Sequence, residues 1–417
     1  MIATHRIDDK DAASPNSHAG VAIATPPGKP SGLASLATGR TLPYLAARIG
    51  IALARTAGGP IRLGGTVIAA RHGDVSEALA RDLDFVIRPV NAAKFDQIGY
   101  HFILGMDRSA ELVAERRALY TALASVDGAA LQCAAADDIA RLLHDCGSGP
   151  VDVVDGYARP VAAATASRLF GIAPADNATF MDAARAIFGN SFLNVSGDQA
   201  MTDRALAAAA LLSDWFEAEI ARRLAAKEPG RDMMGALLRS GASADLTRRT
   251  LGGMLVGAID TTATVVAKVI SVLVDDRALL ARACADAGDL PRIWGWCNEA
   301  LRRWPHGPII VRKAARDTEL AGTEIKSGDT VFLWTEAAML DPQAFPDPLT
   351  LRPDRPHAPY LHLGGGLHPC AGRGVNAWQI PMLVSALLER HPTRLGRMRW
   401  AGPFPAHLDI HLRGRPA

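Results

Sequence analysis

The chain has 417 residues, a hydrophobic fraction of 49% and a formal net charge of +2. The length allows one large domain or two to three ordinary ones, and the hydrophobic fraction is enough for a substantial core. The near-neutral charge gives no reason to expect nucleic acid or an acidic partner. Five scattered cysteines without C-x-x-C spacing argue against a disulfide scaffold and structural zinc, and favour a reducing cytoplasm.

The first hundred residues predict a tail followed by a mixed region. Residues 1–35 are rich in Pro, Ser, Gly and Ala without periodicity and predict a mobile tail, so that the ordered domain spans 36–417. Order is expected to begin with a helical pattern made by Leu42, Leu45, Ile49 and Leu53. Residues 61–69 predict a hairpin, residues 74–83 a short capped helix, and residues 88–106, which lack a clear period, a loop.

The middle of the chain is dominated by alanine-rich helical patterns. They cover residues 110–124, 139–143, 154–169, 178–188 and 202–225, and residues 188–194 break two of them. Strands are expected only near residues 308–312 and 330–334 in the last quarter. The sequence therefore predicts a mainly α protein with a small β portion. No apolar run is long and uninterrupted enough to predict a membrane span, since the longest, residues 251–274, contains Asp260 and Lys268.

The most informative stretch is residues 363–372, which place Cys370 in a glycine-rich loop directly before an apolar helix-forming run. The glycines allow a tight turn and a close approach to a flat partner. A thiolate near a helix N-terminus is favoured by the helix dipole, and one such thiolate suits a haem iron. Two alternatives are a buried structural thiol and a cysteine nucleophile with His368 as its base, although no orienting partner for that base is evident.

A second pattern is an acid beside an alcohol in a buried helix, over residues 254–266. A buried carboxylate is costly without a partner, so Asp260 next to Thr261 calls for an explanation. A threonine hydroxyl that bonds back to a helix carbonyl opens the helix locally, and an acid beside it can relay protons. The alternative is a hydroxyl satisfied by its own backbone.

A third pattern is Glu299 and Arg302, three residues apart on one face of a helix that Asp289 caps and Pro305 ends. Taken alone, such a pair is usually a surface salt bridge of small energetic value.

In this order and spacing the motifs resemble those of the cytochrome P450 family. The haem-ligand signature of that family is matched by Gly364, Gly366, His368, Cys370 and Gly372, with Leu363 at its aromatic position. Asp260 and Thr261 match its oxygen-activation segment, in which Ala258 stands where glycine is usual. The resemblance implies the cytochrome P450 fold, a triangular helical prism around a buried haem.

The resemblance also assigns roles to further residues. It implies haem b held through Cys370 as the iron ligand, with Arg116, Arg312 and His368 as anchors for the propionates. An exposed helix arginine is the alternative for Arg116. It implies a structural lock of Glu299, Arg302 and Arg355 that holds the cysteine loop, and a substrate pocket lined by Ile309, Ile310 and Ala258.

The function implied is that of a cytoplasmic haem-thiolate monooxygenase, which inserts one atom of dioxygen into a small apolar molecule. The chain carries no flavin or iron–sulfur motif, so electrons are expected from a separate ferredoxin or flavodoxin and its reductase. The sequence is also compatible with two other functions. One is a haem-thiolate enzyme that uses peroxide or needs no external electrons, and the other is a non-catalytic haem sensor.

Overall fold

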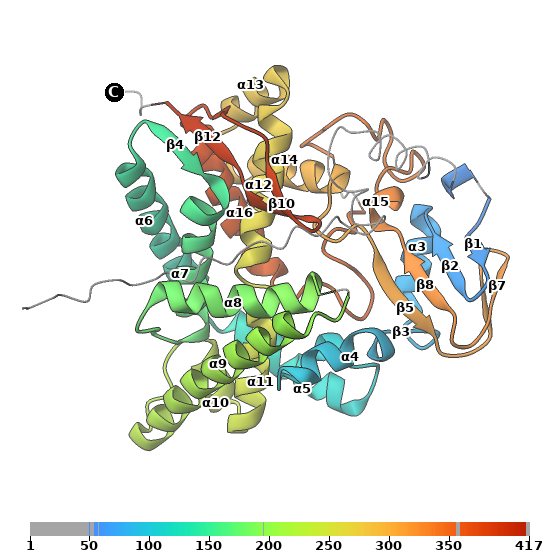
Figure 1. Ribbon diagram of the computed structural model, residues 1–417, viewed down its shortest axis with the longest axis horizontal. Coiled ribbons are helices and arrows are strands. Elements are labelled where there is room, and N and C mark those ends of the chain that lie inside the picture. The colour runs from blue at the N-terminus through green and yellow to red at the C-terminus, as the bar shows by residue number, and fades with distance from the viewer. Residues whose placement is uncertain (1–49, 51–53, 57, 195, 356–358, 414–417) are drawn as a thin grey trace, which may run out of the picture.

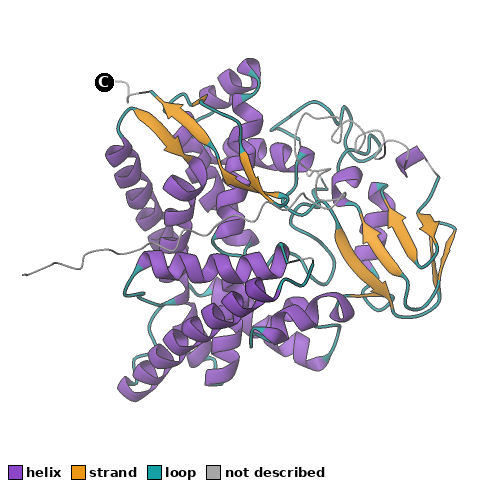
Figure 2. Ribbon diagram, viewed as in Figure 1, coloured by secondary structure: helices purple, strands orange, loops and turns teal. Residues whose placement is uncertain are grey.

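The computed structural model describes residue 50 and residues 54–56, 58–194, 196–355 and 359–413. The predicted tail and the four apolar positions of the first helical pattern lie outside these residues. Helices make up most of the described part, and the strands form one larger sheet at the edge of the molecule and smaller ones elsewhere (Figures 1 and 2). The prediction of a mainly α protein with a small β portion is confirmed.

Most of the long helices begin at a Ser or Asp. The side chain of this residue accepts a hydrogen bond from a free backbone N–H of the first turn. Ser109 accepts from the N–H of Leu112 at 3.0 Å, and Asp289 from that of Arg292 at 3.1 Å, which confirms the cap predicted there. The α-helices are α3 (His72–Ala80), α4 (Arg88–Gln97), α5 (Ala110–Ala124), α6 (Gly128–Cys146), α7 (Arg159–Phe170), α8 (Asn177–Phe192), α9 (Gln199–Ala226), α10 (Met233–Arg239), α11 (Ala244–Leu255), α12 (Asp260–Val274), α13 (Arg277–Ala285), α14 (Leu290–Arg303), α15 (Thr335–Ala338) and α16 (Arg373–Leu388).

The larger sheet joins strands from residues 61–86 with strands from residues 310–333. Its strand order is β1-β2-β8-β5-β3, in which β2 and β8 run parallel and the other pairs are antiparallel. The predicted hairpin over residues 61–69 is present as β1 and β2. The strands are β1 (Ile61–Leu63), β2 (Thr66–Ala69), β3 (Phe85–Val86), β4 (Gly149–Asp152), β5 (Ile310–Ala314), β6 (Thr318–Leu320), β7 (Thr323–Ile325), β8 (Thr330–Leu333), β9 (Thr393–Arg394), β10 (Arg399–Ala401), β11 (Phe404–His407) and β12 (Asp409–Leu412).

The buried apolar side chains form separate clusters around a central helix. One cluster lies among α4, α5 and α7 to α11, and a second among α6, α12, α14 and α16. A third packs the larger sheet against α3. Helix α12 contacts α7 and α8 as well as α14 and α16, and it runs through the middle of the helical part in Figure 1. Side chains on α12 are therefore held from several sides.

The helix predicted over residues 254–266 is opened locally, as expected from a threonine hydroxyl that bonds back to a helix carbonyl. The residues between α11 and α12 are turns, so the helix is interrupted there. The hydroxyl of Thr261 donates to the carbonyl of Gly257, and that of Thr262 donates to the carbonyl of Ala258 at 3.0 Å. A hydroxyl that donates to a helix carbonyl competes with the backbone N–H that would otherwise bond to it. The helix is weakened at that point, which accounts for the interruption.

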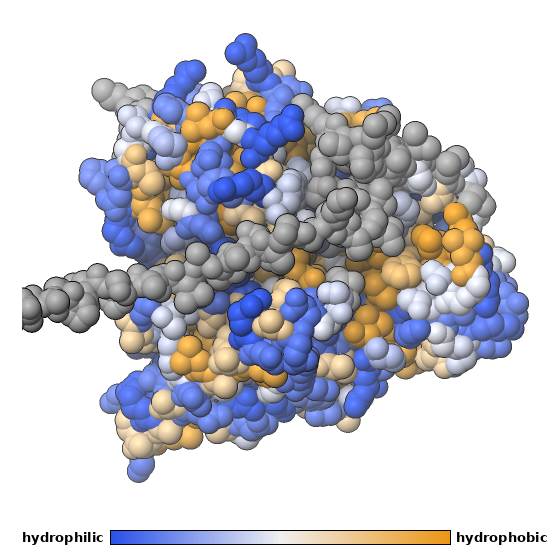
Figure 3. Space-filling view, viewed as in Figure 1, coloured by the Kyte–Doolittle hydropathy of each residue, from blue (hydrophilic) through white to orange (hydrophobic). Residues whose placement is uncertain are grey.

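The apolar side chains of α11 and α12 are mostly buried in the interior of the protein. Within the described residues, Ala244–Val274 is the one helical stretch long and apolar enough to cross a membrane, and 78% of its most apolar part is buried inside the protein. The face of the molecule in Figure 3 is mainly hydrophilic, with apolar residues gathered where the helical part meets the larger sheet.

The prediction of a loop over residues 88–106 is wrong, because α4 and a 3₁₀ turn (Ile103–Gly105) occupy most of it. Pro89 lies in the first turn of α4, where its fixed backbone angle suits a helix. Ala92 and Phe95, three residues apart, are buried on one face while their neighbours are exposed. Only two buried positions are too few to show as a period in the sequence.

Other helix boundaries also differ from the prediction. Helix α3 begins at His72, and Asp74 pairs with Arg71 (Oδ2–Nε 3.0 Å) in its first turn instead of capping it. The break predicted over residues 188–194 falls later, since α8 continues to Phe192. The pattern over residues 139–143 is part of the longer α6, and that over residues 154–169 is a π-helical turn (Val153–Ala158) followed by α7.

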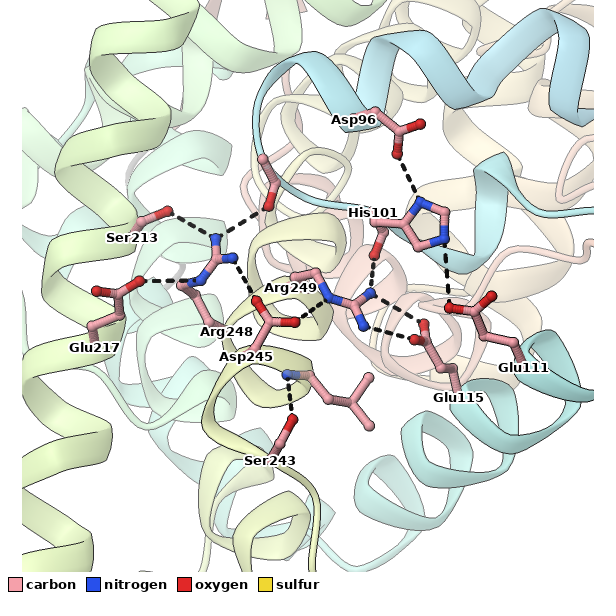
Figure 4. Close-up of polar contacts among 12 residues, drawn as sticks. Asp96, His101, Glu111, Glu115, Ser213, Glu217, Ser243, Asp245, Arg248 and Arg249 are labelled. Atoms are coloured by element: carbon pink, nitrogen blue, oxygen red, sulfur yellow. Dashed lines mark hydrogen bonds and ion pairs between the residues drawn. The ribbon is translucent and has the colours of Figure 1, made fainter.

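A network of ion pairs joins α11 to the elements around it (Figure 4). Arg249 pairs with Asp245 at 2.8 Å and with Glu115 of α5 at 2.8 Å, and it donates to the carbonyl of His101 at 2.6 Å. Arg248 pairs with Glu217 of α9 at 3.2 Å. Because Glu115 is 7% exposed, its pairing with Arg249 is a partly buried contact that fixes α5 against α11.

Candidate active site

The cysteine loop fits against the C-terminal end of α3 because it carries glycine. Gly364 and Gly366 have φ values of +69° and +63°, in the left-handed region that favours glycine. A Cβ on Gly366 would lie 1.7 Å from the carbonyl oxygen of Leu79, in α3. The loop could not take this position with any other residue there.

The loop holds the thiol of Cys370 in a fixed place at the start of α16. The N–H of Cys370 donates to the carbonyl of Leu363 at 2.8 Å, and the N–H of Arg373 donates to the carbonyl of Cys370 at 3.2 Å. Burial raises the pKa of the thiol, while the backbone N–H of Gly372 and the charge of Arg373 oppose that rise. Both opposing groups favour the thiolate, the form that ligates a metal.

Basic side chains converge beside this loop without a carboxylate partner. Arg312 is 6% exposed, and its Nη1 donates to the carbonyl of Val311 at 2.9 Å. Arg116 donates to the carbonyl of Leu367, inside the cysteine loop. Within the part of the chain that the structure describes, no acid forms an ion pair with either arginine.

The charges of Arg312 and Arg116 both act on His368, so the three basic groups lie near one another beside the loop. Burial lowers the pKa of Arg312 to about 10, although the charge of Asp107 opposes the shift. Burial, followed by the charges of Arg312 and Arg116, lowers the pKa of His368 to about 4. A buried cation without a counter-ion is costly, so a site of this kind fits a ligand with carboxylates, such as the two propionates of haem.

A cavity of about 810 Å³ lies next to the sulfur, between α5, α6 and α16. Arg116, Tyr120, Cys370 and Trp378 are among the residues that line it. Its size is in the range of cofactor and small-molecule sites. Of the groups at the cysteine loop, the thiol and Arg116 line this cavity, whereas Arg312, His368 and the glycines at 364 and 366 are not among its lining residues. A thiol with basic side chains beside it is a donor set that fits haem.

The buried carboxylate of Asp260 has partners that the sequence did not reveal. Its Oδ1 lies 3.0 Å from Nε of Arg185, in α8, and 3.2 Å from Nε of Arg159, in α7. Arg185 also pairs with Asp155 at 2.5 Å, and the side chain of Asp155 is 44% exposed. Burial alone would raise the pKa of Asp155, but the hydrogen bond from Arg185 together with the charges of Arg185 and Arg159 brings the pKa below its ordinary value. Charged groups thus run from the buried Asp260 to the surface.

Asp260 and Thr261 are neighbours in sequence with separate contacts. Thr261 is half-buried and its hydroxyl donates to Gly257, whereas Oδ2 of Asp260 is buried without a hydrogen-bond partner among the described residues. The residues expected to line a substrate pocket, Ala258, Ile309 and Ile310, are half-buried. These positions leave part of each side chain free to contact a ligand.

Glu299 and Arg302 form a buried pair and not a surface one. Both side chains are fully buried, and Nε of Arg302 lies 2.8 Å from Oε1 of Glu299. Arg355 reaches the other carboxylate oxygen at 3.1 Å, and the hydroxyl of Tyr360 donates to Oε1 at 3.0 Å. Burial by itself raises the pKa of Glu299, but the hydrogen bonds from Arg302, Arg355 and the N–H of Arg352 together outweigh burial, and the pKa is lowered. These contacts attach α14 to the segment that leads into the cysteine loop.

Aromatic side chains form a cluster near α12, and the sequence did not predict that they meet. His306 stacks on Phe404 with ring centroids 4.5 Å apart, and Phe188 lies 5.1 Å from Phe404. Nδ1 of His306 lies 3.1 Å from the hydroxyl of Thr264, one turn after Thr261 in α12. Burial, with a smaller effect of the Lys268 charge, lowers the pKa of His306 to about 3, so the ring is neutral at physiological pH.

Two sequence comparisons agree on one family. A family model described as cytochrome P450 matches residues 217–395. Nocardicin C N-oxygenase of Nocardia uniformis subsp. tsuyamanensis is 29% identical over 58% of this chain and 60% of that protein. Cytochrome P450 105C1 of a Streptomyces species is 30% identical over 64% of this chain and 67% of that protein. The chain spans about three fifths of the length of the first of these relatives.

Solved structures give the same fold. The crystal structure of CalO2 superposes with a TM-score of 0.77 over 88% of this chain and 96% of CalO2, at 22% identity. The open form of P450 EryK from S. erythraea gives a TM-score of 0.76 over 89% of this chain and 97% of that chain, at 23% identity. The fold predicted by the resemblance is therefore confirmed.

The region matched by the family model contains the cysteine loop, the buried Glu299–Arg302 pair and the interrupted helix. One relative at 30% identity is matched over two thirds of its own length, and the fold agrees over most of the chain. The chain belongs to the cytochrome P450 family, whose cofactor is haem b.

Proposed function

We propose that the protein is a haem-thiolate monooxygenase that inserts one atom of dioxygen into a small apolar molecule and releases the other as water. The observation that carries this proposal is the convergence of Cys370, Arg116, Arg312 and His368 on one site without an acidic partner. A thiolate ligand donates electron density to haem iron, and the bound haem supplies the chemistry that cleaves dioxygen.

The residues of the chain hold the haem and keep it in one orientation. Cys370 is the proposed iron ligand, and the glycines at 364, 366 and 372 let its loop approach the macrocycle. Arg116, Arg312 and His368 are the proposed partners of the propionates. The buried contacts of Glu299 with Arg302 and Arg355 keep the loop in place from behind.

Asp260 and Thr261 are the proposed route for protons. Arg159 and Arg185 pair with the carboxylate of Asp260, and Arg185 links it to the partly exposed Asp155. The free Oδ2 of Asp260 is an acceptor site for a water that moves the proton inward. Thr261, whose hydroxyl already donates to Gly257, would position such a water through its oxygen lone pairs.

The aromatic side chains near α12 favour an apolar substrate. Phe188, Phe192 and Phe404 surround His306, and Phe192 is 43% exposed, so its ring is available for contact. The relatives include proteins named biflaviolin synthase, of Streptomyces coelicolor, and vitamin D3 dihydroxylase, of Streptomyces griseolus. We infer a role in secondary metabolism for this chain.

We further propose that residues 36–417 act as one domain in the cytoplasm and receive electrons from a separate ferredoxin or flavodoxin. The five cysteines are free, as expected in a reducing compartment. Arg373 is exposed beside the cysteine loop, where a negatively charged carrier would dock close to the iron.

The proposal is tested by following oxygen from gas to product. A library is first screened for compounds that displace water from the haem iron, read as a spectral shift. Compounds that bind are incubated with NADPH, a ferredoxin, its reductase and isotopically labelled dioxygen. One labelled oxygen atom per product is expected, and Thr261→Ala should raise oxygen consumption per product. Turnover with peroxide alone, or binding without any turnover, would contradict a monooxygenase that depends on a redox partner.

A further inference from the structure

A side-chain amide reaches the sulfur of the cysteine loop from the following helix. Nδ2 of Asn376 lies 3.9 Å from Sγ of Cys370, within the longer range of hydrogen bonds to sulfur. Asn376 is held in place by the helix itself, because its N–H donates to the carbonyl of Gly372 at 2.9 Å and closes the first turn of α16. The contact therefore joins two rigid parts of the site.

The surroundings favour a donor and not an acceptor toward the sulfur. A thiolate only accepts hydrogen bonds, so the NH₂ group of Asn376, and not its oxygen, must face it. A Cβ on Gly372 would lie 3.9 Å from Sγ and 4.0 Å from Nδ2, so the glycine leaves the space beside both atoms free. The NH₂ group of Asn376 is the side-chain donor within hydrogen-bond range of the sulfur among the described residues.

We propose that Asn376 is a positioning residue that hydrogen-bonds the iron-ligating sulfur and withdraws electron density from it. This inference rests on haem ligation by Cys370. Hydrogen bonds to a metal-bound thiolate reduce the charge that it donates to iron, and they raise the reduction potential of the metal. Leu363, which stands at the aromatic position of the family signature, brings only apolar contact, so the amide is the polar side chain through which α16 adjusts the sulfur.

The test compares the wild-type holoenzyme with Asn376→Leu, which keeps the size of the side chain and removes the N–H. Two properties of the haem are measured, the ferric–ferrous midpoint potential and the C–O stretching frequency of the ferrous carbon monoxide complex. Without the amide, the sulfur donates more charge. The midpoint potential should fall, and the C–O stretching frequency should fall because the iron passes more electron density to carbon monoxide.

Gln379→Leu is the matched control, because Gln379 lies one turn further along α16, is 3% exposed and makes no contact with the sulfur in the structure. It should leave both properties at their wild-type values. Asn376→Ala is a second variant in case the leucine disturbs haem loading. The inference is overturned if the haem properties stay unchanged in the Asn376 variants, or if Gln379→Leu shifts them equally. A wild-type protein without a thiolate-type carbon monoxide spectrum would instead overturn the proposed function.

Discussion

The carboxylate of Glu299 attaches α14 to the segment that leads into the cysteine loop. In sequence it is an acid three residues from an arginine, which is common on helix surfaces. In the structure it is fully buried and receives hydrogen bonds from Arg302, Arg355 and Tyr360. Removing one partner from such a buried group leaves charges without compensation.

Glu299→Gln should therefore lower the free energy of unfolding by about 3–5 kcal/mol, the range for a broken buried ion pair. Chemical denaturation of the haem-loaded protein measures the change. Glu324→Gln, which removes an exposed partner of Lys326, is the control and should have little effect. Equal effects of the two substitutions would show that burial of Glu299 has no special importance.

Lys268 carries a pH dependence that follows from burial. It is 1% exposed in α12, its Nζ donates to the carbonyl of Pro305 at 2.8 Å, and burial lowers its pKa to about 7. In the unfolded chain a lysine keeps its proton up to a pH of about 10.4. Between these values the unfolded state binds more protons, so this residue makes stability rise with pH from about 7 to about 10.

Lys268→Met, which keeps the length of the side chain without its charge, should remove that contribution. The variant should exceed the wild type in stability most at pH 7 and least near pH 10, as measured by urea denaturation at both values. Lys94→Met, at an exposed lysine, should leave the pH dependence unchanged. Parallel stability curves for the wild type and Lys268→Met would contradict the assignment.

At the scale of elements, the cysteine loop and α3 must fit closely for the sulfur to reach its place. Gly366→Ala would put a Cβ 1.7 Å from the carbonyl oxygen of Leu79, so the loop must move away from α3. We expect the variant to retain much less haem per mole of protein. Gly374→Ala, in the first turn of α16, meets no atom within 4 Å and should load haem as the wild type does. Equal loading of both variants would show that the close fit is not required.

The elements also show where sequence patterns reach their limit. The boundaries of α5 and the cap of α14 were predictable because local patterns and capping residues determine them. Helix α4 was not predictable, since two buried positions make no period. The interruption before α12 depends on how threonine hydroxyls and carbonyls pair, and periodicity carries no information on that.

At the scale of the whole molecule, the fold class and the cysteine loop followed from the sequence, because local composition and spacing carry both. The partners of Asp260 did not, since Arg159 and Arg185 come from other helices and look like ordinary helix arginines. Asn376 was missed for a related reason, because its distance to the sulfur depends on how the loop meets α16. Long-range contacts of this kind need the tertiary structure.

The central claim is that Cys370 binds haem iron as a thiolate, in a site built from α5, β5 and the loop that precedes α16. The most direct measurement is the carbon monoxide difference spectrum of the purified, reduced protein, compared with that of Cys370→Ala at equal haem content. The account predicts a band at the position typical of a thiolate ligand in the wild type and its loss in the variant. A protein that stays colourless after reconstitution with haem, or a variant that keeps the band, would contradict it.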